Sequence, residues 1–190
     1  MIKLRYTTTT SWTTAVLADF DSFLLDHAGA EKKASGMAMS MALHYADKPD
    51  IVSAMIDLAI EELDHFREVV KIMATRNLQL QKDSKDTYIN QLRKQLRNGK
   101  DDYFLDRLLL GGVIEARGAE RFGLVAAALQ EGELKTFYTA ISGSEDRHRD
   151  LFIQLAGNHF TEPTIAARLD QWLDIEASLA STLTNRPALH

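Results

Sequence analysis

The chain has 190 residues, of which 45% are hydrophobic, and it contains no cysteine. This length and composition suffice for one domain with a sizeable core, and the lack of thiols excludes disulfides, iron–sulfur clusters, thiolate metal sites and cysteine nucleophiles. The formal net charge of −5 argues against a polyanionic partner. Two bound divalent cations would add +4 and bring the formal charge to about −1, so the distribution of charge matters more than its total.

The beginning of the chain does not look like a targeting segment. Residues 1–10 lack the apolar run of a signal peptide. No stretch of about 18 apolar residues follows in the rest of the sequence. We therefore expect a cytoplasmic protein that does not enter a membrane.

Apolar residues recur at three- and four-residue steps along most of the chain, which is the pattern of amphipathic helices. Only three prolines interrupt it, at positions 49, 163 and 187. The predicted helices cover, in chain order, residues 13–46, about 50–75, a short stretch near 87–96, a third long helix after Asp101 and Asp102 that ends before the turn at 131–133, about 134–157 and about 163–184.

The connections between these helices indicate the topology. Short turns follow the first and third long helices, and one long polar crossover, residues 77–100, lies between the two pairs. Two antiparallel hairpins joined in this way are typical of ferritin-like four-helix bundles. We predict an all-α chain that forms a single domain, 1–190, with the bundle over about 13–157 and the C-terminal fifth helix packed outside it.

Two Glu-x-x-His motifs lie on the second helix of each hairpin, one from Glu62 to His65 and one from Glu145 to His148. Residues three apart are neighbours on a helix, so each motif presents its carboxylate and imidazole on one face. Taken alone, such a motif is weak, because short pairs of Glu and His also arise by chance.

The position of two further glutamates makes the pattern specific. Glu31 precedes Glu62 by 31 residues, and Glu115 precedes Glu145 by 30. Each hairpin therefore contributes one Glu from its first helix and one Glu-x-x-His from its second, at the same level of the bundle. This internal repeat is the pattern of di-iron and di-manganese carboxylate proteins.

Four carboxylates in one layer of a core would repel each other and lose their hydration, at a cost of several kcal/mol each, unless cations lie between them. We therefore predict a dinuclear metal site. Its six ligands are Glu31, Glu62, His65, Glu115, Glu145 and His148. Carboxylate and imidazole ligands together favour iron, as Fe2+ or Fe3+, over zinc or magnesium, with manganese as an alternative. Two iron ions in such a site can activate O2 for attack on a C–H bond.

One of these ligands has a competitor. Glu120 follows Glu115 by five residues, and the string Gly-Ala-Glu that ends at Glu120 resembles the one that ends at Glu31. Five residues correspond to about 500° of helical rotation, so Glu120 lies off the inward face. We assign the ligand to Glu115 and interpret Glu120 as a solvated acid or one that supports the site.

Three glycines lie on or beside the inward face of the third long helix, namely Gly111, Gly112 and Gly118. A glycine inside a helix costs about 1 kcal/mol relative to alanine, so these positions need space. The sequence leaves two explanations open, a channel towards the metal and close packing of two helices.

Basic residues form two groups. Lys32 and Lys33 follow a predicted ligand, and Arg93, Lys94 and Arg97 lie in the crossover. These groups fit either a solvated helix surface or a local edge that binds phosphate. Physical reasoning from the sequence does not separate the two.

Four segments carry a more specific pattern: LDHAGAEKKAS at 25–35, EELDHF at 61–66, IEARGAERF at 114–122 and SEDRH at 144–148. Between about residues 12 and 160 the chain resembles the bacterial tRNA 2-methylthio-N6-isopentenyladenosine hydroxylases. The Asp-His-Ala-x-x-Glu-Lys-Lys string is not required by iron ligation, so this resemblance goes beyond the ligand pattern.

The resemblance implies a di-iron monooxygenase that uses O2 to hydroxylate the isopentenyl side chain of the modified adenosine at position 37 of tRNA. That base lies in a single-stranded loop, from which it can be splayed into a pocket. The resemblance further implies tRNA as a partner, with the two basic groups as possible contacts. An external electron donor is expected, because the chain has no flavin or nicotinamide motif.

Two alternatives remain open at this stage. One is iron oxidation and storage, as in ferritin or bacterioferritin. The other is a di-metal oxidase that acts on a small molecule.

Overall fold

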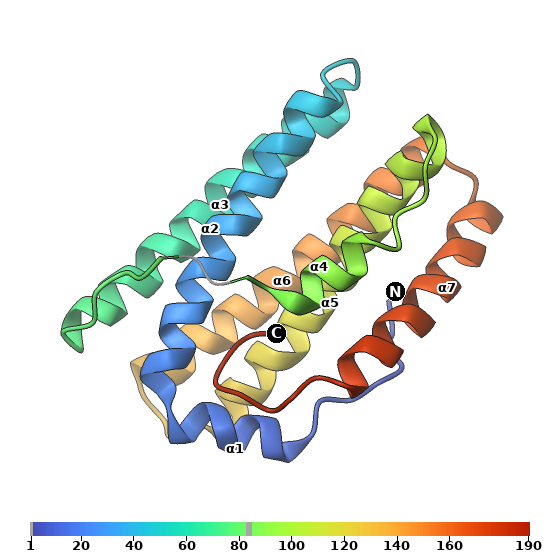
Figure 1. Cartoon of the computed structure of the whole chain (residues 1–190). Helices are drawn as coiled ribbons and strands as arrows, with labels where there is room; N and C mark the ends of the chain where they lie inside the picture. Colours follow the sequence, from blue (N-terminus) through green and yellow to red (C-terminus); the bar gives the residue numbers. More distant parts are fainter. Residues whose placement is uncertain (1, 83–84) are drawn as a thin grey trace. The chain divides into compact units, whose positions relative to one another are not determined.

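The computed structural model describes residues 2–82 and 85–190, and these residues form seven helices and no strand (Figure 1). The helices are α1 (Thr10–Ala18), α2 (Phe20–His44), α3 (Pro49–Thr75), α4 (Thr87–Arg93), α5 (Lys100–Ala128), α6 (Glu133–His159) and α7 (Glu162–Ser181). They belong to two compact units: residues 15–84 and 186–189 form the α2/α3 unit, and residues 1–14, 85–185 and 190 form the α5/α6 unit. Within the described ranges, no helix is long and apolar enough to cross a membrane.

The α2/α3 unit is an antiparallel helical hairpin. The side chain of Asp19 caps α2 by accepting a hydrogen bond from the backbone N–H of Ser22 at 3.1 Å. Pro49 occupies the first turn of α3, where its missing N–H costs no helical bond. The Ser35 hydroxyl donates to the carbonyl of Ala59 at 2.8 Å and so joins the two helices near their middle.

A C-terminal segment belongs to the same unit. The backbone N–H of Leu189 donates to the Asp26 carboxylate on α2 at 2.7 Å. Ala188 and Leu189 are both buried. Residues 186–189 therefore have a fixed place along α2.

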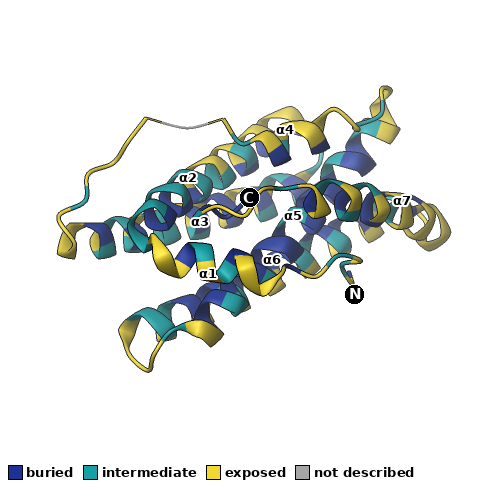
Figure 2. Cartoon of the chain, turned by 60° about the horizontal axis from the view of Figure 1, so that its bottom comes forward, coloured by how far each residue is buried: buried dark blue, intermediate teal, exposed yellow. Residues whose placement is uncertain are grey.

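The α5/α6 unit is built around α5, which is buried along most of its length (Figure 2). Its close contact with α6 explains one of the glycines. A Cβ atom at Gly111 would lie 2.6 Å from the ring of Phe152, a separation that real Cβ atoms essentially never show. Close helix packing, not a channel, accounts for this position.

α7 packs against α5 and α4 as the predicted fifth helix, through two buried ion pairs. The guanidinium of Arg117 donates to both carboxylate oxygens of Glu176, at 2.8 and 2.9 Å, and the Tyr88 hydroxyl donates to the same carboxylate at 2.8 Å. Nearby, Arg168 donates to both oxygens of Asp106, at 2.7 and 2.8 Å. These bidentate pairs fix α7 in orientation as well as in position.

The predicted helix boundaries need three corrections. The single helix expected over 13–46 is two helices, because the backbone of Asp19 leaves the helical region (φ −141°, ψ 68°) and its side chain caps α2. The short helix ends at Arg93 instead of residue 96. Gly157 does not end α6, which continues to His159.

Candidate metal centre

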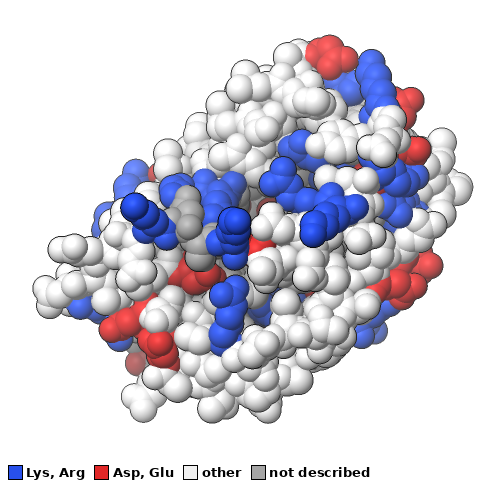
Figure 3. Space-filling model, in the orientation of Figure 1, with Lys and Arg blue, Asp and Glu red and all other residues white. Residues whose placement is uncertain are grey.

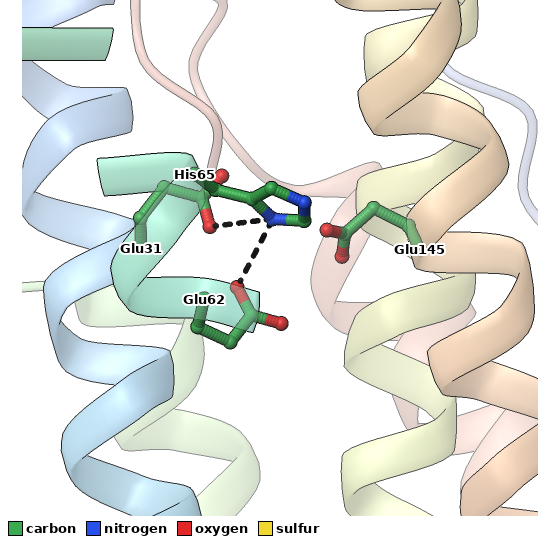
Figure 4. A group of neighbouring side chains, drawn as sticks. All are labelled: Glu31, Glu62, His65 and Glu145. Carbon is green, nitrogen blue, oxygen red and sulfur yellow. Dashed lines mark ion pairs between the residues drawn. The ribbon is translucent and has the colours of Figure 1, made fainter. Parts of the chain in front are cut away.

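The first group of predicted ligands lies in the middle of the α2/α3 hairpin. One ligand atom each of Glu31, Glu62 and His65 lie within 4.8 Å of one another. The Nδ1 atom of His65 is 3.7 Å from Glu31 Oε2 and 3.6 Å from Glu62 Oε2 (Figure 4). Both glutamates are almost fully buried, with 3% and 1% of their surface exposed. We call these three residues the first half-site.

The electrostatics of the first half-site favour a cation. Burial by itself lowers the pKa of His65, but hydrogen bonds with Glu31 and Glu62 outweigh burial and raise this pKa to about 10. Burial also acts to raise the pKa of Glu31, yet the neighbouring His27 and His65 hold it below its ordinary value. The Glu31 carboxylate thus stays ionised although it is buried, and it attracts positive charge.

His27 is a contributor whose role was not predicted. Its Nε2 atom is 2.5 Å from Glu31 Oε1, and its side chain is fully buried. A histidine four residues before a ligand lies on the same face of the helix. The four-residue spacing between His27 and Glu31 could therefore have indicated this contact from the sequence. The hydrogen bond between the two side chains fixes the orientation of the Glu31 carboxylate.

The second group lies in the α5/α6 hairpin and repeats the first. One ligand atom each of Glu115, Glu145 and His148 lie within 4.8 Å of one another. All three side chains are buried. His148 Nδ1 is 3.9 Å from Glu145 Oε1, and the Ser144 hydroxyl lies 3.4 Å from the other ring nitrogen. We call Glu115, Glu145 and His148 the second half-site.

Gly118 makes room for this half-site. It lies on α5 one turn after Glu115, and a Cβ atom there would be 3.0 Å from Glu145 Oε2. An alanine would therefore press on the carboxylate of a predicted ligand. Unlike Gly111, this glycine serves the polar cluster and not the packing of apolar side chains.

Gly118→Ala is accordingly expected to weaken metal binding about tenfold, since displaced support for a ligand typically costs one to two orders of magnitude in affinity. Titration of the purified protein with Fe(II) under anaerobic conditions measures this. Gly143→Ala is the matched control, because a Cβ on this α6 residue meets nothing within 4 Å. That control should keep the affinity and gain up to about 1 kcal/mol in stability. Equal affinities for the two variants would contradict the role given to Gly118.

The structure places Glu120 outside these clusters. Its carboxylate accepts hydrogen bonds from the backbone N–H and the hydroxyl of Thr8, at 2.8 and 2.7 Å, and it also pairs with Arg117. Glu120 therefore ties the N-terminal segment to α5. Its side chain is partly exposed, whereas Glu115 is buried with Glu145 and His148.

The predicted basic groups lie in different settings. Lys32 and Lys33 are exposed and line a pocket of the α2/α3 unit. Arg93 and Lys94 are exposed at the end of α4. The guanidinium of Arg97 instead binds the buried Asp106 carboxylate at 2.9 Å and pairs with Asp102 at 2.8 Å, so it has a structural role in the α5/α6 unit.

Each half-site offers two buried carboxylates and one imidazole, with Gly118 leaving space beside one of them. This donor set fits a redox-active divalent metal. A solved structure, "Protein 43 with aldehyde deformylating oxygenase activity" from Synechococcus, matches the whole chain and 96% of its own length, with a TM-score of 0.94 and 31% identity. Fold and site together define a ferritin-like helical protein with buried carboxylates and histidines that could hold a metal, and the predicted fold class is confirmed.

Within that class, the chain belongs to the tRNA-(MS[2]IO[6]A)-hydroxylase (MiaE) family, whose sequence model matches residues 2–190. A tRNA 2-(methylsulfanyl)-N(6)-isopentenyladenosine(37) hydroxylase from Pseudomonas putida is 36% identical over 156 residues, 82% of this chain and 76% of that protein. The enzyme of the same name from Salmonella typhimurium is 33% identical over 141 residues, 73% of this chain and 52% of the Salmonella protein. The predicted family is confirmed, and the match extends beyond residues 12–160.

Proposed function

We propose that this protein is a non-haem di-iron monooxygenase that uses O2 to hydroxylate the isopentenyl side chain of 2-methylthio-N6-isopentenyladenosine at position 37 of tRNA. Membership of the hydroxylase family over residues 2–190 supports the substrate. The observation that carries the chemistry is the pair of buried half-sites, each with two carboxylates and one imidazole. The cytoplasm, where tRNA is found, is the proposed location.

The proposal includes one dinuclear iron centre held by both half-sites in a single ferritin-like domain. It is supported by the sequence repeat, in which each hairpin supplies the same three ligand types at matched positions. Charge also supports it, because two Fe(II) ions offset the four carboxylates. The chemistry that such a centre supplies is the reductive activation of O2 for insertion into a C–H bond, with electrons from an external donor.

The chain's own residues orient the ligands and keep the site dry. His27 holds the Glu31 carboxylate through a hydrogen bond, and Gly118 leaves the space that Glu145 occupies. The ligands other than His65 are at most 5% exposed, so bulk water does not compete at the half-sites. The target base, which is splayed from a single-stranded loop, would need to reach this buried layer.

A second candidate is oxidation of a small molecule, which the similarity to the Synechococcus oxygenase favours. The sequence identity to that oxygenase is 31%, which is lower than the 36% and 33% identity to the two tRNA hydroxylases. We do not propose iron storage, because the family and both of these relatives are named as hydroxylases.

The test is hydroxylation in vitro. Protein loaded with iron, a chemical reductant, O2 and an anticodon stem-loop that carries the modified adenosine should give a nucleoside one oxygen atom heavier, detected by mass spectrometry after digestion. Iron analysis should give two ions per chain. Protein that holds two irons and converts an aldehyde but leaves the stem-loop unchanged would overturn the tRNA proposal in favour of the small-molecule candidate.

A further inference from the structure

A pocket of about 360 Å³ lies entirely within the α2/α3 unit. Successive turns of α2 form one wall of the pocket, and Phe66 of α3 forms part of a second wall. Residues 80–82 and 186–188 complete the lining. A volume of this size accommodates a ligand of about one nucleotide.

Basic side chains dominate the charged residues of this pocket. Lys32, Lys33, Lys82 and Arg186 line it, and Asp26 is the acidic residue among the described lining residues. The Asp26 carboxylate already accepts the N–H of Leu189. Four positive charges against one negative charge stand out in a chain whose net charge is −5. Figure 3 shows Lys and Arg side chains gathered on the face that carries α2.

The remaining lining is largely apolar. Leu25, Phe66, Leu80 and Pro187 contribute carbon surface beside the basic groups. Cations for a phosphate next to an apolar or aromatic surface for a sugar or base are the features of proteins that bind single-stranded nucleic acid.

None of the described lining residues of the pocket belongs to the first half-site. The residues of α2 that line it are at positions 22, 25, 26, 28, 29, 32 and 33. All of them except Ala28 lie on one face of the helix, and Ala28 lies beside that face. Glu31 follows Gly29 by two residues and so lies about 200° around α2. A ligand in the pocket therefore does not touch Glu31, and the pocket suits a part of the substrate that does not react.

We propose that Lys32, Lys33, Lys82 and Arg186 bind backbone phosphates of the tRNA substrate, at nucleotides next to the one that is oxidised. This inference rests on the proposed function and names the surface that holds the RNA. Phosphate contacts of Lys and Arg supply affinity and register without reading sequence. A helix is about 10 Å across, so a flexible strand can cross it and keep one phosphate in the pocket while a nearby base reaches the other face.

The test compares two fourfold variants of the iron-loaded protein. The first replaces the four pocket residues: Lys32→Ala, Lys33→Ala, Lys82→Ala and Arg186→Ala. The matched control removes the same charges elsewhere: Lys3→Ala, Arg67→Ala, Lys71→Ala and Lys135→Ala. Binding of the modified anticodon stem-loop is measured by fluorescence anisotropy between 50 and 200 mM salt, and iron content and circular dichroism check the fold. Over this range of salt concentration, the release of counterions from the RNA makes the affinity fall measurably.

The pocket variant should bind the stem-loop at least tenfold more weakly than the control. Its plot of log affinity against log salt should be shallower by about 3, because each of the four lost phosphate contacts removes about 0.7 to 0.9 from the slope. Wild-type affinity and slope in the pocket variant, with the wild-type protein active on the stem-loop, would overturn the pocket inference and leave the function standing. Calorimetric binding of inorganic phosphate that the pocket variant loses, with its RNA affinity unchanged, would assign the pocket to a free anion and also overturn it. A wild-type protein that neither binds nor hydroxylates the stem-loop would overturn the function itself.

Discussion

Replacing Glu115 by alanine is expected to remove most of the bound iron and to lower hydroxylation at least 100-fold while the helices stay folded. Glu115 is buried, and one of its carboxylate oxygens lies within 4.8 Å of a ligand atom each of Glu145 and His148, so it is the third candidate donor of the second half-site. Loss of a donor directly weakens metal binding. The fold of the metal-free protein is kept, because the substitution removes only one of several neighbouring negative charges. Iron content per chain, circular dichroism and the stem-loop assay measure the three effects.

Glu120→Ala is the matched control on the same helix. This variant should keep its iron, because the Glu120 carboxylate accepts hydrogen bonds from Thr8 and pairs with Arg117 instead of facing the cluster. It should lose about 1–3 kcal/mol of unfolding free energy, since the buried Thr8 and Arg117 groups lose their acceptor. Full iron in the Glu115 variant together with depleted iron in the Glu120 variant would reverse our assignment.

Replacing Glu176 by alanine is expected to have the largest effect on stability. Its carboxylate accepts two hydrogen bonds from Arg117 and one from Tyr88, and both Glu176 and Arg117 are fully buried. Burial acts to lower the pKa of Arg117, but Glu176 outweighs it and raises that pKa, so the guanidinium stays charged. Arg117 also pairs with Glu120, but that carboxylate is partly exposed, so the loss of the fully buried partner Glu176 should cost about 3–5 kcal/mol. Urea unfolding measures the loss, which corresponds to about 6–20 °C in Tm.

Two further variants show whether the ion pair is responsible. Glu162→Ala removes an exposed carboxylate at the start of α7 and should change the unfolding free energy by less than about 0.5 kcal/mol. The double variant Arg117→Met with Glu176→Leu removes both charges and should recover part of the loss. A Glu176→Ala protein that loses less than about 1 kcal/mol would show that the remaining pair with Glu120 is enough to stabilise the Arg117 charge.

The helices and the clustering of the candidate ligands within each hairpin could be predicted because both are encoded in local spacing. Apolar steps of three and four residues define buried faces, and a Glu-x-x-His motif needs only one turn to present both side chains. Glu115 could be separated from Glu120 for the same reason, since five residues rotate a side chain away from the buried face. The structure gives the two glutamates the different surroundings that this rotation predicts.

The features that were not predicted depend on contacts that leave no local pattern in the sequence. The break between α1 and α2 rests on the conformation of one residue, Asp19, inside an uninterrupted apolar repeat. The pair of Arg117 with Glu176 joins residues 59 positions apart, and the basic pocket combines α2 with a segment that follows α7. Such contacts arise only when the chain has folded, so neither spacing nor composition predicts them.

Because residues 186–189 lie along α2, a change at the C-terminal end of the chain can separate the proposed RNA binding from the proposed iron binding. A chain shortened after Asn185 would lose Arg186 and the bond to Asp26, yet it would keep all six candidate ligands. Iron uptake can then be studied in a protein whose affinity for RNA is expected to be lower. For the same reason, an affinity tag fused directly behind His190 would be attached next to the surface that we assign to the substrate.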